Sequence, residues 1–137
     1  MKRIFAIALF AASSLAAAGN LSAQNHHQMK ANIPFAFTMG SKTLPAGSYT
    51  ISSPSPDVVT VRNDQNRMAS ASVVHESDKQ SPNSVLVFHR YGNQYFLEEI
   101  LSPNAMNVSV PRCKREQSAQ REIAALREST QTLVALK

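Results

Sequence analysis

The sequence predicts a mainly β fold, either a small antiparallel β-sandwich or a partly open β-barrel of about six to seven strands, followed by a C-terminal amphipathic α-helix. Three observations support this prediction. Short runs that alternate apolar and polar residues recur roughly every ten positions, with turn residues between them. The last segment changes to a helical period. The chain has one cysteine, so no intrachain disulfide can form and packing must supply the stability.

The first 23 residues predict export. A basic pair at positions 2–3 precedes an apolar run at 4–18, and residues 21–23 (LSA) end in the small side chains that signal peptidases prefer. The apolar run is shorter than the roughly 20 residues that cross a bilayer, so we expect no transmembrane segment in the mature chain. Gln24 stands where a lipoprotein signal carries cysteine, which argues against a lipid anchor. We expect a periplasmic or extracellular protein.

The predicted divisions are a signal peptide (1–23), a flexible N-terminal arm (24–30), a β domain (31–111), and a basic junction with a C-terminal helix (112–137). In the first predicted strand Ile33, Phe35 and Phe37 point to one side, and Pro34 favours an edge position because proline cannot donate to a strand ladder. Proline, glycine, asparagine and aspartate supply the turns between the later strands. These strands are predicted at 49–51, 58–62, 68–75, 85–91, 94–100 and 107–110.

The C-terminal helix is predicted from Lys114 to Leu136, where no glycine or proline occurs. An apolar stripe recurs at spacings of four and three along one helical face, formed by Ala119, Ile123, Leu126, Thr130 and Leu133. We favour packing of this stripe on the sheet of the same chain. A homodimer through the helix is the alternative, but the stripe is shorter than the roughly three to four heptads of a coiled coil.

The charge distribution does not predict a nucleic-acid partner. Residues 24–111 contain six Lys or Arg and six Asp or Glu, whereas residues 112–137 contain six basic and three acidic residues. The positive excess therefore lies in the tail and the signal peptide, and it does not form a basic face across the β domain.

Three segments resemble a known family. They are PFAF (34–37), GSKTLPAGSYTI (40–51) and VLVFHRYGNQYFLEEI (85–100), and the junction PRCKRE (111–116) follows them. With their LPAGxY and VFHRYGxxYFLxE motifs, they are similar to small exported proteins found in many copies in acidobacterial genomes. The resemblance covers most of the chain from Ile33 to about Arg115. That family has no assigned activity, so the resemblance implies a single exported β domain of a Gram-negative envelope or its exterior and no catalytic residue.

The segment Val87–Ile100 carries the strongest hairpin signal. With Gly92-Asn93 as a two-residue loop, glycine in first place favours a type II′ turn. The pairs that follow are Tyr91 with Gln94, Arg90 with Tyr95, His89 with Phe96, Phe88 with Leu97 and Val87 with Glu98. Strand alternation then places Arg90 and Tyr95 on one face, where we expect them to stack, and His89, Glu98 and Ile100 on the other.

His89 and Glu98 are predicted to be diagonal neighbours across this hairpin. A histidine held by a glutamate is half of a general-base arrangement, so an enzyme that uses these two residues is one hypothesis. However, no serine lies in a G-x-S-x-G elbow, and the cysteine is not next to a histidine in the sequence. We interpret the pair as structural and predict no catalytic residue.

A metal site depends on where the signal peptide is cleaved. If Gln24 becomes the first residue, His26 is third and His27 lies beside it. A free amine, two backbone nitrogens and an imidazole then form the square-planar nitrogen set that copper and nickel prefer. Periplasmic copper or nickel binding through Gln24-Asn25-His26 is therefore an alternative function, which cyclisation of Gln24 would abolish. The sequence predicts no other cofactor.

Cys113 is a second reactive candidate. Arg112, Lys114 and Arg115 surround it, and nearby positive charge favours the thiolate. An unpaired cysteine in an exported protein is free, oxidised or joined to another chain. A homodimer linked through Cys113 is one prediction, and we favour a buried thiol or one without a functional role.

The incomplete catalytic set, the neutral β domain and the helical tail favour a non-enzymatic function. We expect an exported binding or envelope-structural module, whose partner is an unknown protein or an envelope polymer.

Overall fold

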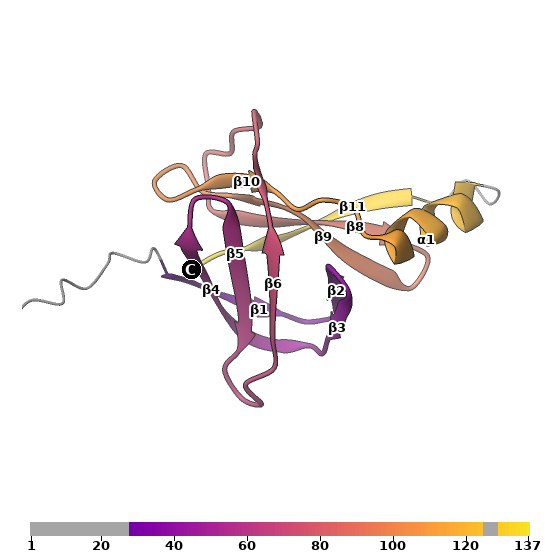
Figure 1. Cartoon of the computed structure of the whole chain (residues 1–137), viewed down its shortest axis with the longest axis horizontal. Coiled ribbons are helices and arrows are strands. Elements are labelled where there is room, and N and C mark those ends of the chain that lie inside the picture. Colours follow the sequence, from indigo (N-terminus) through magenta and orange to yellow (C-terminus); the bar gives the residue numbers. More distant parts are fainter. Residues whose placement is uncertain (1–27, 125–128) are drawn as a thin grey trace, which may run out of the picture.

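The computed structural model describes residues 28–124 and 129–137 and has a mainly β fold with one helix (Figure 1). The predicted signal peptide and most of the predicted arm, at 1–27, lie outside the described residues. None of the helical residues within the described ranges forms a helix long and apolar enough to cross a membrane.

The strands form two sheets. The first sheet is antiparallel and contains, in spatial order, β1 (Gln28–Ile33), β4 (Gly47–Ser55), β5 (Val58–Asn63) and β6 (Ala69–Val73). The second contains β11 (Ser129–Ala135), β8 (Val85–Tyr91), β9 (Gln94–Leu101), β10 (Asn107–Ser109) and β7 (His75–Glu76). A hairpin of β2 (Phe37–Met39) and β3 (Lys42–Leu44) adds to β9, where Thr38 pairs in parallel with Phe96.

The two sheets meet at two corners. At one corner the N–H groups of Lys30 and Lys137 each donate to the other's carbonyl, at 3.1 and 2.8 Å, and join β1 to the end of β11. At the other corner the chain runs from β6 into β7 through the buried Val74. The N–H of Val74 donates a hydrogen bond to the carbonyl of Asp57. The sheets therefore curl into a partly open barrel, which is one of the two architectures that the sequence predicts (Figure 1).

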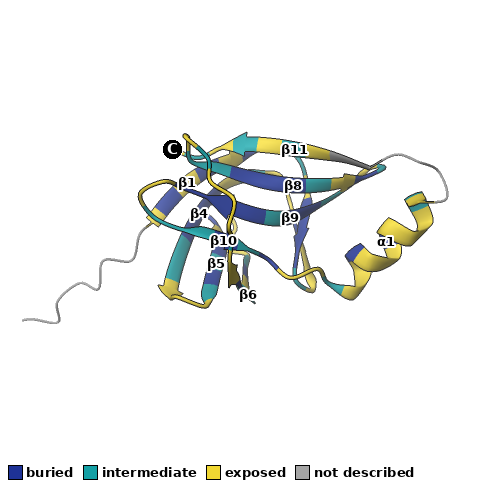
Figure 2. Ribbon diagram, turned by 90° about the horizontal axis from the view of Figure 1, so that it is seen from above, coloured by how far each residue is buried: buried dark blue, intermediate teal, exposed yellow. Residues whose placement is uncertain are grey.

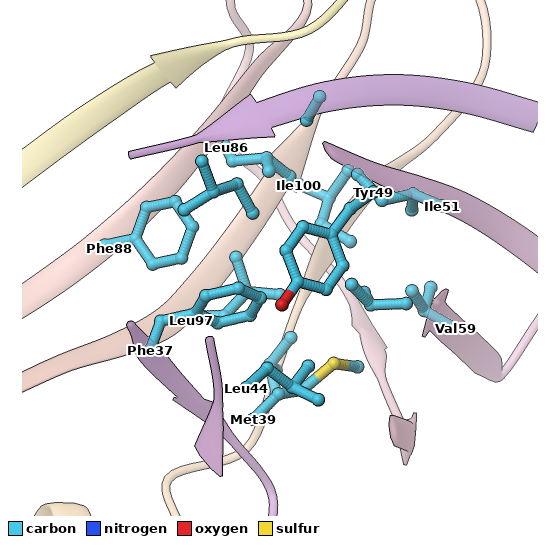
Figure 3. Close-up of a cluster of buried hydrophobic side chains, with 14 of the residues drawn as sticks. Phe37, Met39, Leu44, Tyr49, Ile51, Val59, Leu86, Phe88, Leu97 and Ile100 are labelled. Carbon is cyan, nitrogen blue, oxygen red and sulfur yellow. The ribbon is translucent and has the colours of Figure 1, made fainter. Parts of the chain in front are cut away.

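Apolar side chains fill the barrel, because alternate residues of its strands point inward (Figure 3). Phe37 is buried in this core, with its ring 5.2 Å from that of Tyr49 and 5.4 Å from that of Phe88, both edge to face. The Tyr49 hydroxyl donates to the carbonyl of Pro45, and burial raises the pKa of this phenol. The barrel interior is thus a packed core.

The N-terminal boundary of the β domain is earlier than predicted. β1 begins at Gln28 and buries Met29, so residues 28–30 belong to the barrel and not to a flexible arm. The single strand predicted through Ile33 and Phe37 is also wrong, because the chain leaves β1 at Pro34 and re-enters a sheet at Phe37. Proline has no N–H to continue the ladder, which explains the interruption.

The predicted C-terminal helix is too long. Helix α1 spans Lys114–Ala124, whereas Ser129–Ala135 form strand β11. In this last segment partly buried Thr132, Val134 and Leu136 alternate with exposed Gln131, Leu133 and Ala135, which is a period of two. Leu133, and Thr130 with it, therefore belong to a strand and not to a helical stripe; Leu126 lies outside the described residues. Backbone pairing with β8 overrides the weak helical pattern, and threonine and valine suit a strand.

Replacing Leu136 with alanine should lower the free energy of unfolding by about 2 kcal/mol, because its side chain packs on the barrel core. The matched change Leu133→Ala should cost less than about 0.5 kcal/mol, because Leu133 is 65% exposed. Equilibrium urea denaturation measures both. A larger loss for Leu133→Ala than for Leu136→Ala would contradict the strand register and favour the helix.

Candidate functional site

The hairpin of β8 and β9 carries the residues singled out in the sequence. Its pairs run as predicted from Tyr91 with Gln94 to Phe88 with Leu97. Gly92 has φ of +61° and Asn93 has a negative φ, which fits a type II′ turn. A side chain at Gly92 would also begin 3.2 Å from Cδ1 of Ile123 in α1, so glycine lets the helix approach the turn.

A β-bulge changes the register beyond Phe88. Val87 pairs with Glu99 and not with Glu98 as predicted, so Glu98 is the extra residue. The bulge turns Ile100 into the barrel core, although it was predicted on the face of His89. It also lets Lys79 reach both glutamates, at 3.0 Å from Glu99 and 3.9 Å from Glu98.

His89 bridges two carboxylates on the outer face of the sheet. Its Nε2 lies 3.0 Å from Oε2 of Glu98, and its Nδ1 lies 3.1 Å from Oε1 of Glu116. The side chains are 13%, 17% and 4% exposed for His89, Glu98 and Glu116. We call these three residues the His89 cluster. The predicted proximity of His89 and Glu98 is present, and the third member comes from α1.

Helix α1 lies at the hairpin end of the sheet (Figure 2), and its buried residues are Glu116 and Ala119. Cys113 precedes the helix, and its sulfur accepts the N–H of Glu116 at 3.4 Å, as an N-cap does. Ala119 and the partly buried Ile123 pack with Tyr91 and Phe96. The same chain therefore covers the apolar face of α1, and the two predicted modes of dimerisation, through the helix or Cys113, stay predictions.

Burial controls the electrostatics of the His89 cluster. It raises the pKa of Glu116 above its ordinary value of 4.5, while the hydrogen bond to His89 and the charge of Arg112 act in the opposite direction. The Arg112 Nε lies 3.9 Å from Glu116, and the Gln131 amide donates to Glu98 at 3.1 Å. Burial, together with the charge of Glu116, raises the pKa of the Tyr91 phenol.

The geometry favours a structural role for His89. A general base needs a free ring nitrogen that faces a substrate, and both nitrogens of His89 face carboxylates. On the opposite face, Arg90 lies 5.6 Å from the centroid of the Tyr95 ring, as expected, and that ring stacks on Phe35 at 4.0 Å. Asn93 is exposed in the turn.

Metal ligation is not supported by the described side chains. Among them no group of three or more His, Cys, Asp or Glu residues is arranged to hold a metal ion. His26 and His27, the predicted copper or nickel ligands, lie outside the described residues.

A polar groove of about 510 Å³ lies between the segments 76–80 and 102–107. The Ser77 N–H donates to the Asn107 carbonyl at 2.9 Å and ties the two walls together. Within the second wall, the Asn107 side chain accepts the Ser102 N–H at 3.0 Å. The side chains of Asp78, Gln80 and Asn104 are exposed there and take part in no hydrogen bond within the described structure. They are available to a ligand.

Sequence reasoning missed Glu116 and the groove. Glu116 had a local signal, because acidic residues are favoured in the first turn of a helix, but its contact with His89 spans 27 positions. No short-range pattern connects a hairpin residue with the helix that later covers it. The groove likewise joins two loops that are distant in the sequence.

Glu116→Gln should flatten the pH dependence of stability. Because the pKa of Glu116 is raised in the folded state, this group stabilises the fold below its ordinary value of 4.5 and loses that contribution as the pH rises through the folded pKa. The free energy of unfolding of the wild type, measured by urea denaturation, should fall relative to that of Glu116→Gln by up to about 1.4 kcal/mol per pH unit in that window. Glu122→Gln, at an exposed position, should behave like the wild type. The same slope of unfolding free energy against pH in Glu116→Gln and Glu122→Gln would show that Glu116 is not the titrating group.

No protein-family model, curated protein or solved structure matches this chain. The chemistry of the His89 cluster and of the groove therefore follows from their own distances, burial and charges.

Proposed function

We propose that this chain is an exported, non-enzymatic binding module of the cell envelope, and that it holds a neutral polysaccharide segment in the groove between residues 76–80 and 102–107. The observation that carries the proposal is a tied, open groove whose free side chains are polar. Export rests on the basic start, apolar run and small-residue end of the first 23 residues.

The packed interior of the barrel favours ligand binding at its outer surface. Phe37, Tyr49 and Phe88 are buried inside it, so the barrel is built as a core and not as a container for an apolar cargo. Both ring nitrogens of His89 are occupied, which favours a non-enzymatic module.

The chemistry of the groove supports the ligand class. Sites for small apolar molecules are lined mainly by apolar and aromatic side chains, whereas Asp78, Gln80 and Asn104 offer amide and carboxylate groups. A hydroxyl-rich chain can replace the water bonded to these groups at little cost. Glu76 and Asp78 disfavour an anionic polymer by charge repulsion.

The double variant Gln80→Ala/Asn104→Ala should bind neutral glycans about tenfold or more weakly, because two hydrogen bonds of roughly 0.5–1.5 kcal/mol each are lost. A neutral-glycan array identifies the probe, and titration calorimetry with that glycan measures the loss. Gln94→Ala/Asn32→Ala removes the same groups from exposed positions outside this groove and should bind like the wild type.

The proposal fails if no neutral glycan binds, or if both double variants bind alike while their circular dichroism stays native. Preferential binding to an acidic glycan would also contradict it.

A further inference from the structure

We propose that the His89 cluster is a proton-dependent latch, which holds α1 against the sheet while it keeps one shared proton and frees α1 when that proton is lost. This inference concerns the conformation of α1 and does not depend on a ligand in the groove.

The proton count follows from the two contacts of His89. Nδ1 of His89 forms a hydrogen bond with Glu116 at 3.1 Å, and Nε2 forms an ion-pair contact with Glu98 at 3.0 Å. At these distances each nitrogen–oxygen contact is favourable only when one of its two atoms carries a hydrogen. A neutral imidazole carries one N–H. The second hydrogen is therefore either a second N–H on His89 or the O–H of a glutamic acid. In both cases the cluster holds one proton more than a neutral histidine between two carboxylates.

When that proton is lost, a nitrogen lone pair of His89 faces a carboxylate oxygen with no hydrogen between them. With Glu116 only 4% exposed, water cannot readily replace the missing hydrogen, so the buried contact becomes repulsive. A further proton on either carboxylate leaves a hydrogen in each contact. The latch is therefore closed on the acidic side and opens as the pH rises.

Groups from every neighbouring element face the cluster. Tyr91 comes from β8, Gln131 from β11, Lys79 from the segment after β7, and Arg112 and Cys113 from the junction before α1. Arg112 and Lys79 each lie 3.9 Å from a carboxylate of the cluster and favour its ionised form. Both side chains are largely exposed, so solvent screens their charge, and they set the pH of opening without replacing the shared hydrogen.

The latch is important to α1 because the helix has few other attachments. Its apolar contact consists of the buried Ala119 and the partly buried Ile123, next to Cys113. Among the described residues, its other polar contact with the barrel runs from Arg115 Nη1 to the Thr43 hydroxyl at 2.8 Å and is exposed. Opening the latch would uncover Tyr91 and Phe96, which are 3% and 1% exposed when α1 is docked.

Hydrogen exchange of the purified protein between about pH 5 and 9 tests the latch. The protection factors of α1, corrected for the intrinsic effect of pH, should fall by up to about tenfold per pH unit above the titration, because one proton is lost on opening. Those of β4 and β5 should stay well above those of α1 at every pH, because these strands exchange only when the whole domain unfolds. In Glu116→Gln the amide N–H can donate to Nδ1 while Nε2–H donates to Glu98, so α1 should stay protected at high pH.

The control Glu122→Gln alters an exposed carboxyl group of the same helix and should follow the wild type. His89→Ala should leave α1 weakly protected at every pH. Constant protection of α1 in the wild type, the same fall in Glu116→Gln, or equal protection of α1 and β5 across the pH range, which signals global unfolding, would each overturn the proposal. Alkylation of the partly buried Cys113, relative to urea-unfolded protein at the same pH, should accelerate together with the exchange of α1.

Discussion

The pairing of β11 with β8 is the interaction on which the architecture depends, because β11 also carries the chain to β1 and joins the two sheets. Strand β8 would otherwise present an unpaired edge, and the corner at Lys30 and Lys137 would not form. The inward side chains Val134 and Leu136 complete a core whose other members come from residues 29–110. The last strand thus joins the two sheets and completes a core that residues 29–110 largely form.

The bulge at Glu98 separates the two faces of the second sheet. Without the extra residue, strict alternation would keep Ile100 on the side of His89 and Glu99 on the side of the core. With it, Ile100 enters the core, and Glu99 meets Lys79 and the Ser77 hydroxyl at 3.0 and 3.1 Å. The one inserted residue therefore keeps both adjacent glutamates out of the apolar interior.

The outer surface carries the features that bear on function. Beneath α1, His89 joins a strand to a helix through buried charges, which is costly unless every hydrogen-bonding position is filled. At the loops beyond β7 and β9, by contrast, polar side chains remain exposed over a groove with tied walls. A filled interior with polar features on its surface is consistent with a module that binds through its outer face.

The sequence alone determined the β class, most strand positions, the Gly92 turn and the first part of its register, because alternation and turn chemistry act over a few residues. Tertiary structure decided that Ser129–Ala135 is a strand, that Glu98 is bulged and that Glu116 reaches His89. Each of these outcomes depends on a partner far away in the chain. Local propensities are weak compared with the cost of leaving backbone groups or carboxylates unpaired in a buried place, and only the folded chain supplies their partners.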